Sequence, residues 1–325
     1  MQRRHFIAAS ASVSALGLLA ASSAHANEWP SRAIRVIVPG GPGSPADVAI
    51  RAMQDVLARE LGQSVVVDNR AGGQGIIGVE ATAKAAPDGY TIGLINLQSA
   101  VTPALRVKTP FDLQRDFVPV TQLTTESPIL LARKDLGVKT LAELVALAKT
   151  RPGELTLGSA GAGTPSHLGM ALLQRAAGIE LRHIPYRTIA AAITDLSGGM
   201  VDVVLGGSAA AQQGINGGRL VALAIAAPQR KKAFADLPTL AEAGYPGVDL
   251  RGWTGVVAPM GTPPAIVARL GQAFATALAD PGVSSRIATS GAEVGGVVGP
   301  AFGAFVAAEE RRWRKVVVDE KITRD

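Results

Sequence analysis

Short β-branched runs alternate with helical patterns along the chain, and this alternation limits the possible folds more than any other feature. In the first half we predict strands at 34–38, 65–67 and 90–95, separated by helices at 47–61 and 78–86. A helix between successive strands is the pattern of parallel strands joined by crossover helices. The alternation therefore predicts an α/β fold with a mainly parallel, doubly wound sheet.

The second half repeats this scheme and then becomes helical. Because 325 residues are too many for one small core, we expect two α/β domains followed by helices. The elements predicted here are helices at 141–149, 167–177 and 189–196, strands at 155–157, 181–185, 201–205 and 220–225, and tail helices at 266–279, 283–290 and 300–318.

The first 26 residues have the features of an export signal. Arg3 and Arg4 precede an apolar stretch to about Ala21, and the sequence then reads Ala24-His25-Ala26. The pattern predicts a signal peptide at 1–26, cleaved after Ala26. The arginine pair fits a twin-arginine signal, but an ordinary secretory leader fits as well. Since no later apolar run has the length of a membrane-spanning helix, we expect a soluble periplasmic protein.

Composition excludes several kinds of chemistry. The chain has no cysteine, which excludes disulfides, thiolate metal sites and a cysteine nucleophile. Only four histidines occur, and His5 and His25 lie in the leader, so we expect no metal site and no cofactor. Basic residues are scattered among acidic ones and aromatic residues are 4%, which argues against nucleic-acid binding. The net charge of +6 suits an anionic small molecule.

Two loops share the pattern Gly-x-Gly-[Ser/Thr]-Pro. They are Gly41-Pro42-Gly43-Ser44-Pro45 and, 120 residues further on, Gly161-Ala162-Gly163-Thr164-Pro165. Each lies between a predicted strand and a predicted helix. Glycine lets backbone N–H groups approach a ligand closely, Ser or Thr is a preferred N-cap, and proline suits the first helical position. Each loop is therefore predicted to form a helix N-terminus that can bind an anion.

The two loops together indicate a ligand cleft. Ligands of open α/β sheets lie at the carboxyl ends of the strands, where both loops are placed. The pair could hold the two ends of a dicarboxylate, or one carboxylate from both sides. The alternative is that both loops are simply well-capped turns.

Further motifs resemble the Bug family of periplasmic solute-binding proteins, the receptors of tripartite tricarboxylate transporters. The resemblance covers essentially the whole mature chain and implies a type II periplasmic-binding-protein clamshell of two doubly wound α/β domains. It places 27–126 and 250–325 in one domain and 127–249 in the other. The motifs include Trp29-Pro30, Asn69-Arg70-Ala71-Gly72-Gly73, Ala86-Pro87-Asp88-Gly89-Tyr90-Thr91, Ser166-His167-Leu168, His183-x-Pro-Tyr186, Leu237-Pro238-Thr239 and Gly261-Thr262-Pro263.

The resemblance also implies a site for a small carboxylate, held mainly by backbone amides and hydroxyl groups. By position, one wall would consist of Gly41, Pro42, Gly43, Ser44 and Asp47, and the other of Gly161, Gly163, Thr164, Ser166 and His167. Supplementary contacts would come from Ser99, Ser127 and Tyr186.

The sequence departs from the family pattern at Gly206. Many relatives carry an acidic residue at this position, where it could pair with a ligand amino group, but this chain reads Leu205-Gly206-Gly207-Ser208. The change argues against an amino-acid ligand. It also predicts space for a bulkier acid.

Other functional patterns fit the sequence less well. The segment 73–78 matches a dinucleotide-binding glycine pattern, but no acidic residue follows at the required distance. Ser166 and His167 are adjacent on a predicted helix and point in different directions, so they do not form a catalytic pair. We expect His183 to be a core or interface histidine, and Trp253 to pack at the hinge.

We therefore predict a monomeric receptor, not an enzyme, that delivers a carboxylate to the membrane subunits of a tripartite tricarboxylate transporter. A ligand-sensing protein for a membrane kinase and an exported enzyme remain the alternatives.

Overall fold

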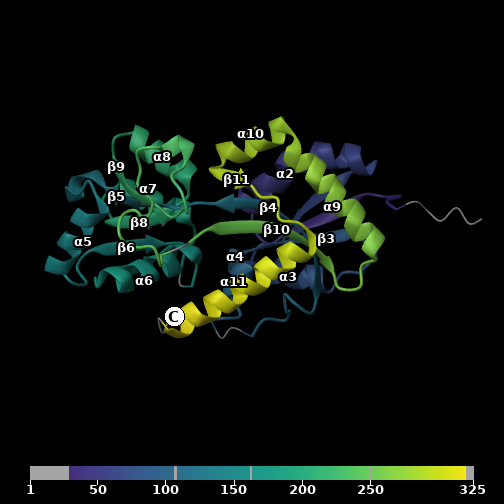
Figure 1. Ribbon diagram of the computed structural model, residues 1–325, viewed down its shortest axis with the longest axis horizontal. Helices are drawn as coiled ribbons and strands as arrows, with labels where there is room; N and C mark the ends of the chain where they lie inside the picture. The colour runs from purple at the N-terminus through teal and green to yellow at the C-terminus, as the bar shows by residue number, and fades with distance from the viewer. Residues whose placement is uncertain (1–28, 106–107, 162, 249, 320–325) are drawn as a thin grey trace, which may run out of the picture.

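The computed structural model describes residues 29–105, 108–161, 163–248 and 250–319, so the predicted signal peptide lies outside the described residues. The chain forms two β-sheets with helices on both faces of each, and these two units lie side by side as two lobes (Figure 1).

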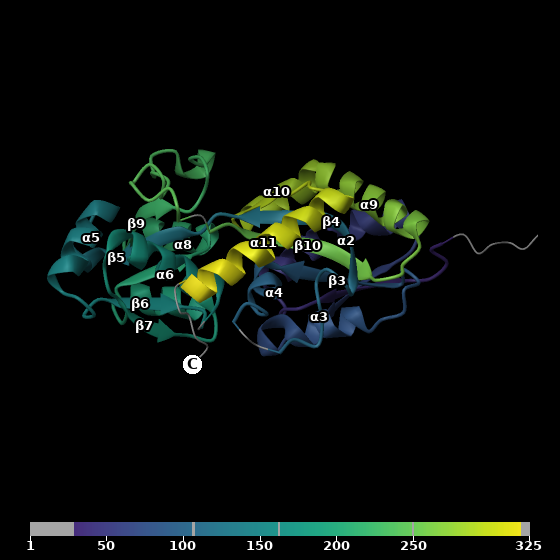
Figure 2. The same cartoon turned by 60° about the horizontal axis from the view of Figure 1, so that its bottom comes forward.

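The first lobe contains the sheet of order β11-β4-β10-β3-β1-β2. Helices α2, α9 and α10 cover one face of this sheet, and α3, α4 and α11 cover the other (Figure 2). The strands are β1 (Ile34–Val38), β2 (Val65–Asn69), β3 (Thr91–Asn96), β4 (Phe117–Glu126), β10 (Gly252–Pro259) and β11 (Ala292–Val294). The helices are α2 (Pro45–Leu61), α3 (Ile76–Ala83), α4 (Leu97–Val101), α9 (Pro264–Ala279), α10 (Pro281–Thr289) and α11 (Gly299–Asp319).

The second lobe contains the sheet of order β7-β6-β8-β5-β9. Buried residues of α5 and α6 pack on one face of this sheet, and those of α7 on the other. The strands are β5 (Ile129–Arg133), β6 (Thr156–Ser159), β7 (Arg182–Pro185), β8 (Val203–Gly206) and β9 (Leu220–Ile225). The helices are α5 (Leu141–Thr150), α6 (Pro165–Ala177), α7 (Ile189–Ser197) and α8 (Ser208–Asn216).

The α/β fold with two lobes is confirmed, but the expectation of mainly parallel sheets is wrong. Among the predicted strands, β1 pairs in parallel with β2 and β3, and β6 with β7 and β8, whereas β9 pairs antiparallel with β5. Strands β4, β5, β10 and β11 were not predicted from the residues, and their pairings are all antiparallel. Each sheet is therefore mixed.

The chain passes between the lobes beside two of these unpredicted strands. After β4 ends at Glu126, only Ser127 and Pro128 separate it from β5 in the second lobe. The chain returns to the first lobe before β10, which pairs with β4 along its whole length. The two connections therefore lie next to each other at the ends of paired strands.

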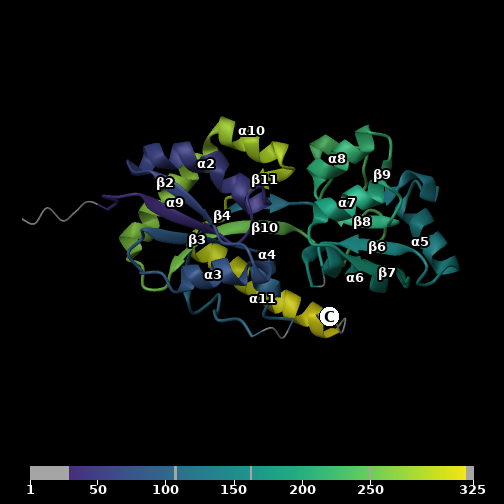
Figure 3. The same ribbon diagram turned by 180° about the vertical axis from the view of Figure 1, so that it is seen from behind.

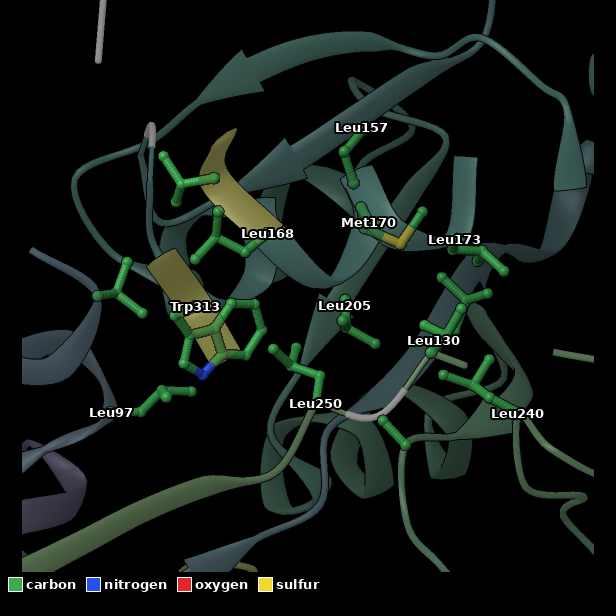
Figure 4. Close-up of a cluster of buried hydrophobic side chains, with 14 of the residues drawn as sticks. Leu97, Leu130, Leu157, Leu168, Met170, Leu173, Leu205, Leu240, Leu250 and Trp313 are labelled. Atoms are coloured by element: carbon green, nitrogen blue, oxygen red, sulfur yellow. The ribbon is translucent and has the colours of Figure 1, made fainter. Parts of the chain in front are cut away.

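Helix α11 extends from the first lobe to the side of α6 (Figure 3). Its Trp313 is fully buried in a cluster that includes Leu97 of the first lobe and Leu168 and Leu205 of the second (Figure 4). This hydrophobic cluster is shared by both lobes and lies beside the connections between them.

Within the described ranges, none of the helices combines the length and the apolar character that crossing a membrane requires.

Candidate functional site

The first predicted loop is held by Asp47. Ser44 is the N-cap of α2, Pro45 is its first residue, and Gly43 adopts a positive φ of 79°. The buried Asp47 carboxylate accepts hydrogen bonds from the Gly43 N–H, the Arg51 guanidinium and the Asn69 amide, each at 2.9 Å. The Asp47 carboxylate therefore stabilises the conformation of the first loop through these hydrogen bonds.

Burial disfavours the charged form of Asp47, but these three hydrogen bonds and the positive charge of Arg51 outweigh that effect. The pKa of the Asp47 carboxyl is consequently lowered from its ordinary value, so the carboxylate stays ionised at neutral pH.

The second loop repeats this arrangement with different side chains. Thr164 is the N-cap of α6 and Pro165 follows it. The Gly163 N–H donates to His167 Nδ1 at 3.0 Å, and the Thr164 hydroxyl donates to the Gly161 carbonyl at 2.6 Å. The loop is thus closed by hydrogen bonds between its two glycines and the side chains of Thr164 and His167, which follow them.

His167 also stacks on His183, with ring centroids 4.1 Å apart, and His183 Nε2 lies 2.6 Å from Ser159 Oγ. Both histidines therefore pack beside the second loop and stabilise it.

Residues from both lobes line one cavity of about 370 Å³. Ser44 and Thr164, the N-caps of the two matched loops, both contribute to its wall. By helix geometry, the first amides of α2 and α6 lack a partner within the helix, so this wall can offer N–H and O–H donors to an anion. The lining residues are Gly40, Ser44, Pro45, Ala46, Asn96, Leu97, Gln98, Glu126, Ser127, Pro128, Ala160, Thr164, Pro165, Ser166, Ile189, Leu205, Gly206, Gly207, Leu250, Gly252, Trp253, Thr254, Ser290 and Gly291.

The structure brings together part of the predicted site. Ser44, Ser127, Thr164, Ser166 and Gly206 line the cavity, whereas the remaining nine predicted residues are not among its described lining. Those nine are Gly41, Pro42, Gly43, Asp47, Ser99, Gly161, Gly163, His167 and Tyr186.

Two of these nine residues have clear partners elsewhere. Ser99 is buried and forms a capping box with Asn96 at the start of α4. Tyr186 donates its hydroxyl to Asp195 of α7 at 2.8 Å. The glycines, Asp47 and His167 shape the loops described above. Position in the sequence alone therefore did not distinguish residues that line the cavity from residues that shape its loops.

Gly206 borders the cavity, but the space beside it differs from the expectation. A Cβ atom added to Gly206 would lie 2.8 Å from Ile193 Cδ1. The side-chain direction of this position is therefore filled by the core of the second lobe, and the glycine does not open room for a bulkier acid in that direction.

The second loop also meets the first lobe directly. A Cβ atom added to Gly163 would lie 2.2 Å from Leu105 Cδ1, and Gln98 Nε2 donates to the Gly163 carbonyl at 3.5 Å. The lobes thus touch at the loop that borders the cavity.

One lining residue was missed by the sequence analysis. Glu126, the last residue of β4, is the only charged side chain among the described residues of the cavity wall. Burial raises the pKa of the Glu126 carboxyl from its ordinary value of 4.5 to about 6. The sequence signal would have been an acid directly before the predicted passage from one domain to the other.

The structure describes no group of three or more His, Asp or Glu side chains that could hold a metal ion, within the ranges given above.

Comparisons with known proteins agree with this architecture. A family model described as "Tripartite tricarboxylate transporter family receptor" (TctC) matches residues 49–322. Protein BugT of Bordetella pertussis is 36% identical over 299 residues, which cover 91% of this chain and 92% of BugT. The solved structure of R. palustris Rpa4515 with adipate has a TM-score of 0.82 at 32% identity, and covers 91% of this chain and 99% of that one. The periplasmic binding protein BugD has a TM-score of 0.80 at 31% identity and covers 91% of this chain and all of BugD.

The fold and the cavity between the lobes define a two-lobed binding protein of the periplasmic-binding-protein class. More specifically, the chain belongs to the tripartite tricarboxylate transporter receptor family, and it is similar to BugT and BugD. The resemblance stated from the sequence is confirmed.

Proposed function

We propose that the protein is a periplasmic receptor that binds a small carboxylate, either a di- or tricarboxylate or an aromatic acid, between its two lobes. It delivers this ligand to the membrane subunits of a tripartite tricarboxylate transporter. It acts as a monomer without a cofactor and does not turn the acid over. The signal peptide 1–26 directs its export, with cleavage after Ala26.

The observation that supports this proposal best is that Ser44 and Thr164, the N-caps of two matched loops on different lobes, line the same cavity. The positive ends of two helices, together with the Ser44 hydroxyl, favour a carboxylate over a cation or a neutral molecule. The similarity to the structure with adipate supports the same ligand class.

In this proposal the domains are 27–126 with 250–325, and 127–249. A ligand that contacts both lobes stabilises the closed arrangement relative to the open one, so binding shifts the population toward the form that the membrane subunits recognise.

A thermal-shift panel on the mature protein tests the proposal. The panel contains mono-, di- and tricarboxylates, aromatic acids and acidic amino acids, with nucleotides as the control class. A ligand that binds only the native state raises the melting temperature by mass action. We expect at least one acid to do so, whereas a response to nucleotides and to none of the acids would contradict the proposal.

A further inference from the structure

The cavity has an unusual charge distribution for a site that binds an anion. Among the described lining residues, every polar group other than Glu126 is neutral, and no lysine, arginine or histidine contributes to the wall. Much of the rest of the wall is apolar, including Leu97, Leu205 and Leu250. A ligand in this cavity therefore meets one full charge, and that charge is negative.

The strand neighbours of Glu126 give it no partner. In the sheet it lies opposite Gly252 of β10 and Ala292 of β11. A Cβ atom at Gly252 would lie 3.1 Å from Glu126 Cβ, so the glycine leaves room for this side chain. Neither neighbour can offer a side-chain donor, and no described residue forms a hydrogen bond or ion pair with the Glu126 carboxyl.

The charged residues beside these strand neighbours do not belong to the described cavity wall. Glu293, next to Ala292 on β11, pairs with Lys231 at 2.5 Å. Arg251, next to Gly252, is exposed. Burial alone raises the pKa of the Glu126 carboxyl, which agrees with the lack of a compensating cation beside it among the described residues.

A ligand that fills the cavity removes water from Glu126 and makes its unpaired charge less favourable. A second carboxylate placed beside it adds repulsion, whereas a cationic nitrogen supplies the missing partner. A hydroxyl group can donate a hydrogen bond but does not neutralise the charge.

We infer that Glu126 determines specificity, and that the cavity selects acids that carry a cationic nitrogen in addition to the carboxylate. This inference rests on the proposed function, because the matched loops hold the carboxylate while Glu126 holds the cation. Within the small carboxylates of the proposed function, it favours zwitterions and selects against the di- and tricarboxylates that the proposal also admits.

The test is calorimetric titration at pH 8 with acids of matched length. The six-carbon set is 6-aminohexanoate, 6-hydroxyhexanoate, hexanoate and adipate, and the four-carbon set is 4-aminobutanoate, butanoate and succinate. Within at least one set, the wild type should bind the amino acid at least tenfold more tightly than the unsubstituted acid, and the dicarboxylate most weakly. Glu126→Gln should abolish the preference for the amino acid and improve dicarboxylate binding at least tenfold.

Glu180→Gln is the matched control, because it also removes one negative charge, is exposed, and lies outside the described cavity wall. It should leave all affinities as in the wild type. Thermal unfolding of each variant verifies that it is folded.

Three results would overturn the inference while leaving the proposed function intact. These are a dicarboxylate that binds the wild type as tightly as the amino acid, a hydroxy acid that equals the amino acid, or affinity ratios unchanged by Glu126→Gln. If none of the acids binds either the wild type or Glu126→Gln, while the thermal-shift panel also shows no response to acids, the proposed function fails and the inference fails with it.

Discussion

Asp47 and His167 hold equivalent positions in the two lobes, since each accepts the backbone N–H of the glycine four residues before it, at 2.9 Å from Gly43 and 3.0 Å from Gly163. A carboxylate and an imidazole thus perform the same task. The two loops are alike in backbone geometry because each has a side-chain acceptor one turn into the helix that follows.

Replacing Asp47 with alanine tests this role. Asp47→Ala leaves the Gly43 N–H, the Asn69 amide and the Arg51 guanidinium without their common acceptor, and such losses cost about 1–3 kcal/mol. We expect urea unfolding to show a loss of this size, together with weaker acid binding. Asp55→Ala on the exposed side of the same helix should change the free energy of unfolding by no more than about 0.5 kcal/mol. Equal effects of the two substitutions would contradict the role given to Asp47.

Gly163→Ala tests the contact between the second loop and the first lobe. The new methyl group would collide with Leu105, and the residue would keep a φ of +71°. Gly178→Ala is a control, because Gly178 has a similar φ of +61° but open space around its Cβ position. Both substitutions should reduce stability by about 1 kcal/mol through backbone strain. Only Gly163→Ala should also weaken acid binding, by about tenfold in a titration, and Leu105→Ala should partly restore it.

The raised pKa of Glu126 predicts a pH dependence of stability in the ligand-free protein. The folded pKa of about 6 lies above the ordinary value of 4.5, so the folded state binds more protons than the unfolded state between these values. The contribution of Glu126 is therefore fully present below about pH 4.5 and is lost as the pH rises through 6. Glu126→Gln should gain stability relative to the wild type over this window, by on the order of 1–2 kcal/mol. A difference between the two proteins that stays constant from pH 4.5 to 7, measured by thermal unfolding, would contradict the assignment.

The ion pair between Lys231 and Glu293 joins the two proposed domains at 2.5 Å. Because the Glu293 side chain is about half exposed, the pair contributes at most about 1 kcal/mol. Lys231→Ala should therefore weaken acid binding by no more than about fivefold in 20 mM salt, and salt should screen most of this difference at 500 mM. An effect that persists at high salt would show that Lys231 acts through packing instead.

Much of the fold could be predicted from local patterns. The strands and helices that alternate in each half lie within a few residues of their predicted bounds, as β1 and α2 illustrate. Strands β4 and β10 were missed because they pair over a long sequence separation, with the whole second lobe between them. The local periodicity of the sequence predicts which side of a helix or strand is apolar, but it does not predict which distant strand will pair with that strand.

The same limit explains the partial prediction of the cavity wall. Ser44 and Thr164 could be predicted because N-capping and the glycine pattern are local. The position of Glu126 depends on where β4 ends relative to β10 and β11, which only the assembled sheet determines.

The most direct test of the central claim is calorimetric titration of the tightest-binding acid from the panel into the wild type, Thr164→Val and Thr188→Val. Thr164 lines the cavity, whereas Thr188 is the N-cap of α7 and accepts the Ala191 N–H outside the cavity. We predict that Thr164→Val weakens acid binding at least tenfold, and that Thr188→Val lowers stability by about 1 kcal/mol without changing affinity. An unchanged affinity in folded Thr164→Val would contradict the claim that the matched loops hold the acid.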